Sequence, residues 1–290
     1  MDNTLLQLTE DNYYSSQADM QYMSVSQFKD FAGTTANTSC EETALKKLNG
    51  QITTAPSTSM LVGSYVDAYF EGTLDAFKTE HPEIYKKTGD KGLLADYRQA
   101  EDIIRYIESD VLMSQFLSGQ KQVIMTADLF GVPWKIKMDS YFPDDKIVDL
   151  KIMKDMAPLW SPLLHQKVDF AHFFGYDIQG AIYQKVVEIV TGKKLPFYLA
   201  VATKEKPADK AVIEITQDYL DEAYQFVSDN IEHVLNVKNG VIAPARCGIC
   251  GFCRLDKQLT APIQLKDIMP VQYGNNDDEE EHGPYSLFDD

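Results

Sequence analysis

Two short runs in which apolar and polar residues alternate, each with an aspartate near its end, constrain the fold of this chain most. In the first run, residues 134–139, the alternation sends apolar side chains to one face of a strand and Asp139 to the other. In the second run the same period places Asp149 and Lys151 on one face. The Phe-Pro-Asp-Asp segment between the runs is typical of a turn. The runs are therefore predicted to form a hairpin that brings Asp139 close to Asp149.

Two carboxylates and a lysine on neighbouring strands suit a hard divalent cation. Magnesium prefers one or two protein carboxylates together with water and phosphate oxygens. Lys151 could orient an attacking water, remove its proton, or balance the charge of a phosphoryl transition state. Taken alone, the tripeptide Asp149-Leu150-Lys151 more often marks an ordinary surface pair on an edge strand, because charged residues usually lie on solvated faces.

The length of 290 residues and the hydrophobic content of 44% predict one large domain with a substantial core. The expected divisions are a loosely ordered lead over residues 1–22, a main domain over residues 23–256 and a C-terminal extension over residues 257–290. No apolar run approaches the roughly 20 residues that span a bilayer, and the first residues lack the basic and apolar segments of a secretory leader. A cytoplasmic protein without a membrane partner is expected.

The formal net charge of -17 argues against passive electrostatic binding of nucleic acid. Part of the excess lies in the tail from Asp277 to Asp290, which contains neither lysine nor arginine. The rest of the chain is still acidic, so a DNA-binding cleft must be basic locally. Five lysines near the two aspartates are expected to supply this charge: Lys135, Lys137, Lys151, Lys154 and Lys167.

The remaining hydrophobic patterns predict helices that alternate with strands. Ser24 and Ser26 are candidate caps of a short helix that contains Phe28 and Phe31. Further helices are expected over residues 41–48, 60–71, 93–117 with a break near Ser109, 170–190 and 219–237. Strands are expected over residues 123–130, 195–202 and 211–215, besides the two aspartate runs. This alternation indicates an α/β core with a central mixed sheet flanked by helices.

Gln179 and Tyr183 stand four residues apart on the expected helix over residues 170–190, so both point to the same side. A glutamine and a tyrosine so placed could grip a phosphate backbone. The simpler alternative is a half-buried core tyrosine beside a solvated glutamine.

The chain has four cysteines: Cys40 and a C-x2-C-x2-C run of Cys247, Cys250 and Cys253. In a cytoplasmic chain of this size they indicate metal ligation or catalysis rather than disulfides. Three thiolates at successive three-residue spacing with a distant fourth are typical of ferredoxin-type 4Fe–4S ligation, whereas zinc usually takes cysteines as C-x2-C pairs. The spacing favours an iron–sulfur cluster, with Zn²⁺ as the alternative.

In their order along the chain, Asp139, Asp149-Leu150-Lys151 and Gln179-x-x-x-Tyr183 resemble the motifs of the PD-(D/E)xK nuclease superfamily. The resemblance covers roughly residues 24–255 and is closest to the RecB-type and RecE-type exonucleases, including exodeoxyribonuclease VIII-like phage proteins. It implies a restriction-endonuclease-like core. It also implies that Asp139 and Asp149 bind metal, that Lys151 is the catalytic lysine, and that Gln179 and Tyr183 contact DNA.

The resemblance extends to Gly63-Ser-Tyr-Val-Asp67, where the first helix of the superfamily usually carries Gly-x-x-x-His with a metal-binding histidine. This chain has Asp67 in that place. An aspartate also suits a hard cation, so the departure bears on the identity of the metal more than on the existence of the site. The implied ligands of Mg²⁺ or Mn²⁺ are Asp67, Asp139, Asp149 and the backbone carbonyl of Leu150.

One early cysteine followed by three late ones also resembles the iron–sulfur nucleases of the AddB type and the CRISPR-associated RecB-like exonucleases. By that resemblance a 4Fe–4S cluster on Cys40, Cys247, Cys250 and Cys253 would join the N- and C-terminal segments across the nuclease core, in a structural role. The last gap in the cysteine run is shorter than the gap common in those groups, which leaves the cluster type open.

The tail ends in Pro284-Tyr-Ser-Leu-Phe-Asp-Asp290 and resembles the acidic, aromatic-tipped tails of single-stranded DNA-binding proteins. The alternative is a disordered, solubilising tail. The implied partners are DNA, above all duplex ends, and a single-strand annealing recombinase or a single-stranded DNA-binding protein that docks on the tail.

These expectations combine into a metal-dependent DNA exonuclease that processes duplex ends in phage recombination or repair. Hydrolysis would proceed by in-line attack of water, with one or two magnesium or manganese ions at the reacting phosphate. The alternative is a non-catalytic DNA-end or recombinase-binding module that retains a nuclease fold.

Overall fold

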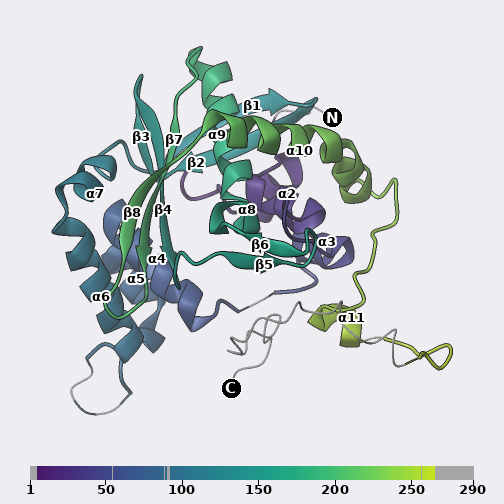
Figure 1. Ribbon diagram of the computed structural model, residues 1–290, viewed down its shortest axis with the longest axis horizontal. Coiled ribbons are helices and arrows are strands. Elements are labelled where there is room, and N and C mark those ends of the chain that lie inside the picture. Colours follow the sequence, from purple (N-terminus) through teal and green to yellow (C-terminus); the bar gives the residue numbers. More distant parts are fainter. Residues whose placement is uncertain (1–4, 54, 88, 90–91, 256, 265–290) are drawn as a thin grey trace.

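The computed structural model of the protein describes residues 5–53, 55–87, 89, 92–255 and 257–264 (Figure 1). The strands are β1 (Val123–Leu129), β2 (Val132–Met138), β3 (Ser140–Phe142), β4 (Lys146–Met153), β5 (Leu159–Ser161), β6 (Gln166–Val168), β7 (Phe197–Thr203) and β8 (Lys210–Ile215). The helices are α1 (Ser16–Gln21), α2 (Val25–Ala32), α3 (Glu41–Leu48), α4 (Thr58–Glu71), α5 (Leu74–Glu80), the 3-10 helix η1 (Pro82–Ile84), α6 (Ala95–Glu108), α7 (Val111–Phe116), α8 (Phe170–Phe174), α9 (Tyr176–Thr191), α10 (Gln217–Lys238) and α11 (Gly251–Leu255).

The central sheet has the strand order β3-β4-β7-β8. β4 pairs with β3 in the antiparallel sense and with β7 in the parallel sense, and β8 is antiparallel to β7. A parallel neighbour requires a crossover connection, which here contains α8 and α9. The predicted α/β core with a central mixed sheet is confirmed.

Both faces of the sheet are covered by helices, so most residues of β4 and β7 are buried (Figure 1). Ile147 belongs to the core formed with α2, α9 and α10, whereas Val148 and Leu150 pack into a second core with α4 and α6. Alternation along β4 therefore directs Asp149 and Lys151 toward the α9 side, as the sequence pattern predicts.

The two aspartate runs do not pair with each other as predicted. β2 pairs with β1, in the register Met125↔Ile136, and the Phe-Pro-Asp-Asp turn instead connects β3 to β4. Asp139 lies between β2 and β3, directly before Ser140, which pairs with Val148. The turn is thus correctly predicted, and the partner of the first run is wrong.

Glycine divides the single helix expected over residues 170–190 into α8 and α9. Gly175 has a φ of +65°, and a Cβ built there would lie 2.7 Å from Lys29 Cδ. A left-handed residue ends a helix, and only glycine adopts it without strain. The break expected near Ser109 is confirmed, since α6 ends at Glu108 and α7 begins at Val111.

Side chains fix where several helices begin, as expected for helices with polar N-caps. Ser24 accepts a hydrogen bond from Gln27 N at 3.2 Å, which confirms it as the cap of α2. Ser57 accepts from Met60 N at 3.3 Å at the start of α4. These caps set the first turns of two helices that flank the sheet.

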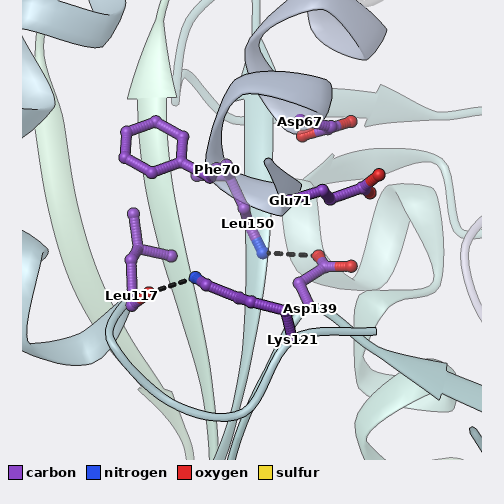
Figure 2. A pocket seen from close by; sticks show the side chains of 7 residues that line it. All are labelled: Asp67, Phe70, Glu71, Leu117, Lys121, Asp139 and Leu150. Carbon is purple, nitrogen blue, oxygen red and sulfur yellow. Dashed lines mark hydrogen bonds between the residues drawn. The ribbon is translucent and has the colours of Figure 1, made fainter. Parts of the chain in front are cut away.

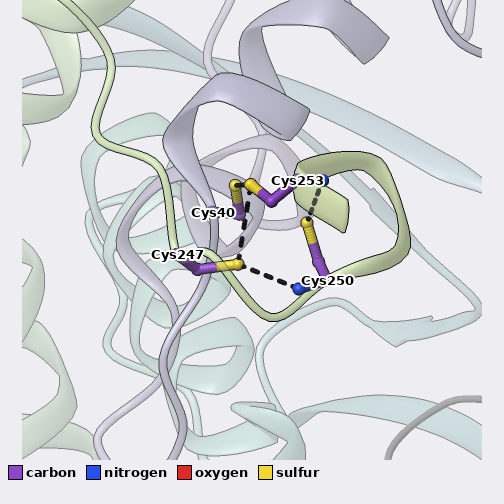
Figure 3. A group of neighbouring side chains, drawn as sticks. All are labelled: Cys40, Cys247, Cys250 and Cys253. Atoms are coloured by element: carbon purple, nitrogen blue, oxygen red, sulfur yellow. Dashed lines mark hydrogen bonds between the residues drawn. The ribbon is translucent and has the colours of Figure 1, made fainter. Parts of the chain in front are cut away.

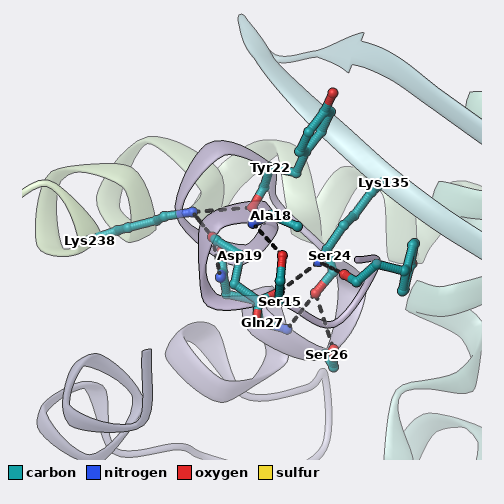
Figure 4. Close-up of polar contacts among 10 residues, drawn as sticks. Ser15, Ala18, Asp19, Tyr22, Ser24, Ser26, Gln27, Lys135 and Lys238 are labelled. Carbon is teal, nitrogen blue, oxygen red and sulfur yellow. Dashed lines mark hydrogen bonds and ion pairs between the residues drawn. The ribbon is translucent and has the colours of Figure 1, made fainter. Parts of the chain in front are cut away.

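The description of residues 1–22 as a loosely ordered lead is wrong for residues 5–22. This segment contains α1, and Tyr13 and Tyr22 are buried. Figure 4 shows Asp19 between two lysines of distant elements. Lys135 of β2 lies 2.6 Å from Asp19 Oδ1, and Lys238 of α10 donates to Asp19 O at 3.0 Å. The buried aromatics and these contacts order the segment against the core.

At the other end, residues 257–264 form no helix or strand. The predicted partner-binding tail, residues 277–290, lies outside the described residues. No helix of the described part of the chain is long and apolar enough to span a membrane.

Candidate active site

The two predicted aspartates lie close together where the inner strand β4 extends past the first residue of β3. Leu150 N donates a hydrogen bond to Asp139 Oδ2 at 2.9 Å, so the backbone of β4 holds the first aspartate beside the second. The N–H and C=O groups of one strand residue point toward the same edge. The carbonyl of Leu150 is therefore directed to the side on which Asp139 lies.

Asp149 and Lys151 form an ion pair on the α9 face of β4. Gln179 of α9 donates its Nε2 to Asp149 Oδ1 at 2.6 Å. Asp149 is only 2% exposed, so these two contacts supply the polar partners that a buried carboxylate needs. The structure thus brings three of the predicted site residues into direct contact.

Helix α4 brings two further acids to the same place. Asp67 and Glu71, one helical turn apart, line a cavity of about 10 Å³ together with Asp139 and Leu150. Figure 2 shows the three carboxylates gathered on one side of this cavity. Among the described residues, the buried Oδ1 of Asp67 has no hydrogen-bond partner. Such an oxygen carries a desolvation cost that a bound cation would remove.

The electrostatics of these acids also fit a cation. Burial and the charge of Asp139 raise the pKa of Asp67 well above its usual range. Burial and the charge of Asp149 raise the pKa of Asp139 to about 7. Carboxylates so close together resist simultaneous ionisation. The donor set is made only of oxygen atoms, which suits Mg²⁺ or Mn²⁺.

Lys151 is positively charged in the metal-free protein. Burial lowers its pKa, but the carboxylates of Asp149 and Asp139 outweigh burial and raise the pKa above its usual value. The ring centroid of Tyr176 lies 4.8 Å from Lys151 Nζ. Lys29 Nζ also lies near that ring, 5.7 Å from its centroid, and donates to Phe174 O at 2.8 Å.

Tyr183 and the lysines that were expected to make the cleft basic are partly engaged in other contacts. Tyr183 is buried, and its hydroxyl donates to Lys137 O at 3.0 Å. Lys135 is 1% exposed and paired with Asp19, so it adds no free charge to a cleft. Lys137 Nζ lies 4.5 Å from the ring centroid of Tyr14. The expectation of a basic cleft is therefore wrong for Lys135.

Four residues at or near the site were missed by reasoning from the sequence. Glu71 stands four positions after Asp67, so the sequence places both acids on one helical face, although only Asp67 is expected from it to bind metal. Lys121 lines the same cavity and donates to Leu117 O. Lys29 and Tyr176 come from elements whose position relative to β4 no local pattern records. Burial and the charge of Lys151 lower the pKa of Lys29 to about 8.

The four cysteines converge on a second site, away from these carboxylates in the sequence (Figure 3). Their Sγ atoms all lie within 4.8 Å of one another, and Cys40 Sγ is 3.6 Å from Cys253 Sγ. Cys40 is the N-cap of α3, whereas Cys253 belongs to α11. The predicted joining of an N-terminal and a C-terminal segment at these cysteines is thus present in the fold, and the group could hold a metal ion.

Contacts around the cysteines fix α3 to the segment that leads to α11. Ala245 N donates to Glu41 Oε2 at 2.8 Å, and Glu42 N donates to Ala245 O at 3.1 Å. Arg246 Nε lies 2.9 Å from Glu42 Oε2. These contacts set the distance between Cys40 and the cysteine run.

Comparison with known proteins bears on the whole chain. Residues 24–256 match the family model described as "PDDEXK-like domain of unknown function (DUF3799)". No curated protein matches the chain. The chain is similar to the crystal structure of a "putative exonuclease" from Eubacterium rectale, with 49% identity, a TM-score of 0.85, and coverage of 90% of this chain and 98% of that chain. The chain therefore belongs to the family of PDDEXK-like domains, within the PD-(D/E)xK nuclease superfamily that the order of its motifs predicts.

Proposed function

We propose that this chain is a metal-dependent DNA exonuclease that hydrolyses phosphodiester bonds at DNA ends. Family membership and the similarity to the Eubacterium rectale structure support a nuclease function. The observation that carries the proposal is the cavity lined by Asp67 and Asp139, where among the described residues the buried Oδ1 of Asp67 has no hydrogen-bond partner. The ion pair of Asp149 with Lys151 lies on the adjoining strand β4.

We expect Mg²⁺ or Mn²⁺ to be bound by Asp67, Asp139 and the carbonyl of Leu150 at the cavity, and by Asp149, whose charge raises the pKa of Asp139. Glu71 lines the same cavity and is a further candidate, directly or through water. A divalent ion bound there supplies positive charge that activates water for attack and stabilises the leaving oxygen.

The residues of the chain have separate roles in the proposed reaction. Lys151 acts as a positive charge beside the reacting phosphate, because its ion pair with Asp149 holds the amine at the site. Gln179 holds Asp149 in its orientation through the 2.6 Å hydrogen bond. Contact of Gln179 and Tyr183 with DNA stays a prediction, and it requires Tyr183 to move from Lys137 O.

The biological setting belongs to the same proposal. The resemblance to RecE-type exonucleases favours duplex ends as substrate, in phage recombination or repair and in the host cytoplasm. An annealing recombinase or a single-stranded DNA-binding protein is the proposed partner of the acidic tail. Lysines supply local positive charge near the acids, with Lys121 at the cavity and Lys29 beside Tyr176.

A digestion assay tests the activity. The protein is incubated with end-labelled linear duplexes and with closed circular duplexes, in Mg²⁺, in Mn²⁺ and in EDTA. We expect release of nucleotides from the linear duplex only, and only with metal. Cutting of the circle would contradict the exonuclease proposal, and binding of ends without cleavage would favour the non-catalytic end-binding module.

Two substitutions locate the activity at the carboxylate site. Asp149→Asn and Lys151→Ala should each lower the rate at least about a hundredfold, since each removes charge at the reacting phosphate. The matched controls are Asp145→Asn in the β3–β4 turn and the exposed Lys193→Ala, both of which form surface ion pairs. Full activity of either site variant in a folded protein would reject the assignment.

We propose a structural role for the four-cysteine site, which holds α3 to the segment before α11. The hydrogen bonds and ion pair of Glu41 and Glu42 with residues 245–246 support this role, because they already join the same two segments. The 4Fe–4S cluster and the Zn²⁺ ion expected from the sequence differ in the sulfur spacing that they need.

A further inference from the structure

The spacing of the cysteine sulfurs discriminates between one metal ion and a cluster. Four thiolates that bind one zinc ion at about 2.3 Å stand at the corners of a tetrahedron with edges of about 3.8 Å. In a 4Fe–4S cubane each thiolate binds a different iron, so the sulfurs are held about 6 Å apart. Here Cys40 Sγ is 3.6 Å from Cys253 Sγ, Cys247 Sγ is 4.0 Å from Cys253 Sγ, and no pair of the four exceeds 4.8 Å.

We propose that Cys40, Cys247, Cys250 and Cys253 form a tetrahedral site for a single Zn²⁺ ion, and that this site does not accept a 4Fe–4S cluster. The proposal stands on the sulfur distances and is independent of the nuclease activity. The sulfur distances thus favour Zn²⁺ over the 4Fe–4S cluster that the spacing of the cysteines in the sequence suggests.

The surrounding contacts oppose a wider site in which α3 and the cysteine run stand further apart. A cubane would require Cys40 to move away from the cysteine run by about 2 Å or more. Cys40 is the N-cap of α3, so α3 would move with it. That movement would break Glu42 N to Ala245 O, at 3.1 Å, and Ala245 N to Glu41 Oε2, at 2.8 Å. The cost of leaving those groups unpaired opposes the larger cluster.

Hydrogen bonds to the sulfurs match those of a compact tetrathiolate. Cys250 N donates to Cys247 Sγ at 3.3 Å, and Cys253 N donates to Cys250 Sγ at 3.4 Å. Thr43 Oγ1 lies 3.5 Å from Cys250 Sγ. Such donors orient the first ligands and stabilise the negative charge of four thiolates on a divalent ion. Soft thiolates arranged as a tetrahedron are a preferred zinc environment.

The charge of the neighbourhood agrees with a dianionic zinc tetrathiolate. Arg246 lies against the site, with Nη2 3.5 Å from Cys253 O. Lys46 Nζ lies 3.8 Å from the ring centroid of Phe252, which stands directly before Cys253. Both cations also pair with Glu42, Lys46 Nζ at 3.1 Å and Arg246 Nε at 2.9 Å, so they offset only part of the charge that the ligands bring together.

Metal analysis of the full chain tests the proposal. The protein is produced with both iron and zinc in the medium, purified without oxygen, and assayed for zinc, iron, acid-labile sulfide and visible absorption. We expect a colourless protein with one zinc ion per chain and no sulfide. Four irons with sulfide, one iron without sulfide, or no bound metal would each overturn the proposal.

Cobalt substitution and one pair of variants identify the ligands. Exchange with Co²⁺ should give the visible bands of a tetrahedral cobalt tetrathiolate, and Cys250→Ser should shift these bands and release most of the metal. Ile249→Ala is the matched control, because Ile249 lies inside the run and is 67% exposed. Its cobalt spectrum should equal that of the parent. An octahedral or thiolate-free spectrum of the parent protein would reject the site even if the serine variant fails to fold.

Discussion

At the scale of single residues, the candidate active site concentrates negative charge where the fold offers little water. Asp67, Glu71 and Asp139 border a cavity with room for about one water molecule. The pKa values of Asp67 and Asp139 are raised because a partly dehydrated carboxylate beside another resists ionisation. The metal-free site is therefore expected to lower the free energy of unfolding at neutral pH, and the proposed cation to restore it.

The raised pKa of Asp139 predicts how stability depends on pH in EDTA. A carboxyl whose pKa is about 7 in the folded state and ordinary in the unfolded state binds more protons when folded. The free energy of unfolding should thus fall as the pH rises from about 4 to about 7, by about 3 kcal/mol from this group. Urea unfolding at a series of pH values measures the slope.

Asp139→Asn isolates this contribution from the other acids. The variant should lose part of the decline in stability with pH, whereas Asp145→Asn in the exposed turn should keep it. Addition of Mg²⁺ at pH 8 should stabilise the parent and not Asp139→Asn. If the stability of the parent and of Asp139→Asn depends on pH in the same way, burial and the charge of Asp149 do not raise the pKa of Asp139.

At the scale of elements, the alternation of side chains predicts which face of a strand each residue occupies. It does not predict which other strand pairs with it. The period of two correctly places Asp149 and Lys151 on one face of β4, because pleating alone decides it. That period says nothing about which strand lies alongside, so β2 pairs with β1 instead of β4. The contacts of Lys29 and Tyr176 with the site depend on crossovers between distant elements, and no local pattern contains them.

The close packing of α9 against β7 and α10 gives a prediction about stability. A Cβ added to Gly180 would lie 2.6 Å from Phe197 Cδ1 and 2.8 Å from Leu220 Cδ2. Gly180→Ala should push α9 away from β7 and α10 and lower the free energy of unfolding by about 1–3 kcal/mol. Chemical denaturation, with circular dichroism as the probe, measures the change.

A second helical glycine serves as the control for that prediction. At Gly63 in α4 the nearest atom to an added Cβ is Ile152 O, 4.0 Å away. Gly63→Ala should therefore leave stability unchanged or raise it by about 0.5–1 kcal/mol, since alanine favours the helix. Equal losses in both variants would mean that close packing of α9 is not the cause.

At the scale of the whole molecule, the N-terminal segment closes over the core through one buried charge. Lys135 is 1% exposed, and its amine contacts Tyr13 O and Asp19 Oδ1. A buried cation that loses its counterion is costly, although the 38% exposure of the Asp19 side chain lets water replace part of the loss. The segment that the sequence presents as polar and without period is thereby tied to β2.

Removal of that counterion should destabilise the protein. Asp19→Ala should lower the free energy of unfolding by about 2 kcal/mol, and Lys135→Met in the same chain should recover most of it. The comparison is Asp102→Ala, whose partner Arg105 lies on the surface and whose loss should cost about 0.5 kcal/mol or less. If Asp19→Ala and Asp102→Ala cost the same, the buried pair is not what holds the segment.

The contact between Cys40 and Cys253 can form only late in the synthesis of the chain. The two residues are 213 positions apart, and Cys40 leaves the ribosome long before its partners have been translated. Domains generally fold from the N-terminus as synthesis proceeds. A chain that stops before Cys247 contains Asp67, Asp139 and Asp149 of the carboxylate site but lacks three of the four cysteines. Assembly of the four-cysteine site therefore distinguishes a full-length chain from a truncated one.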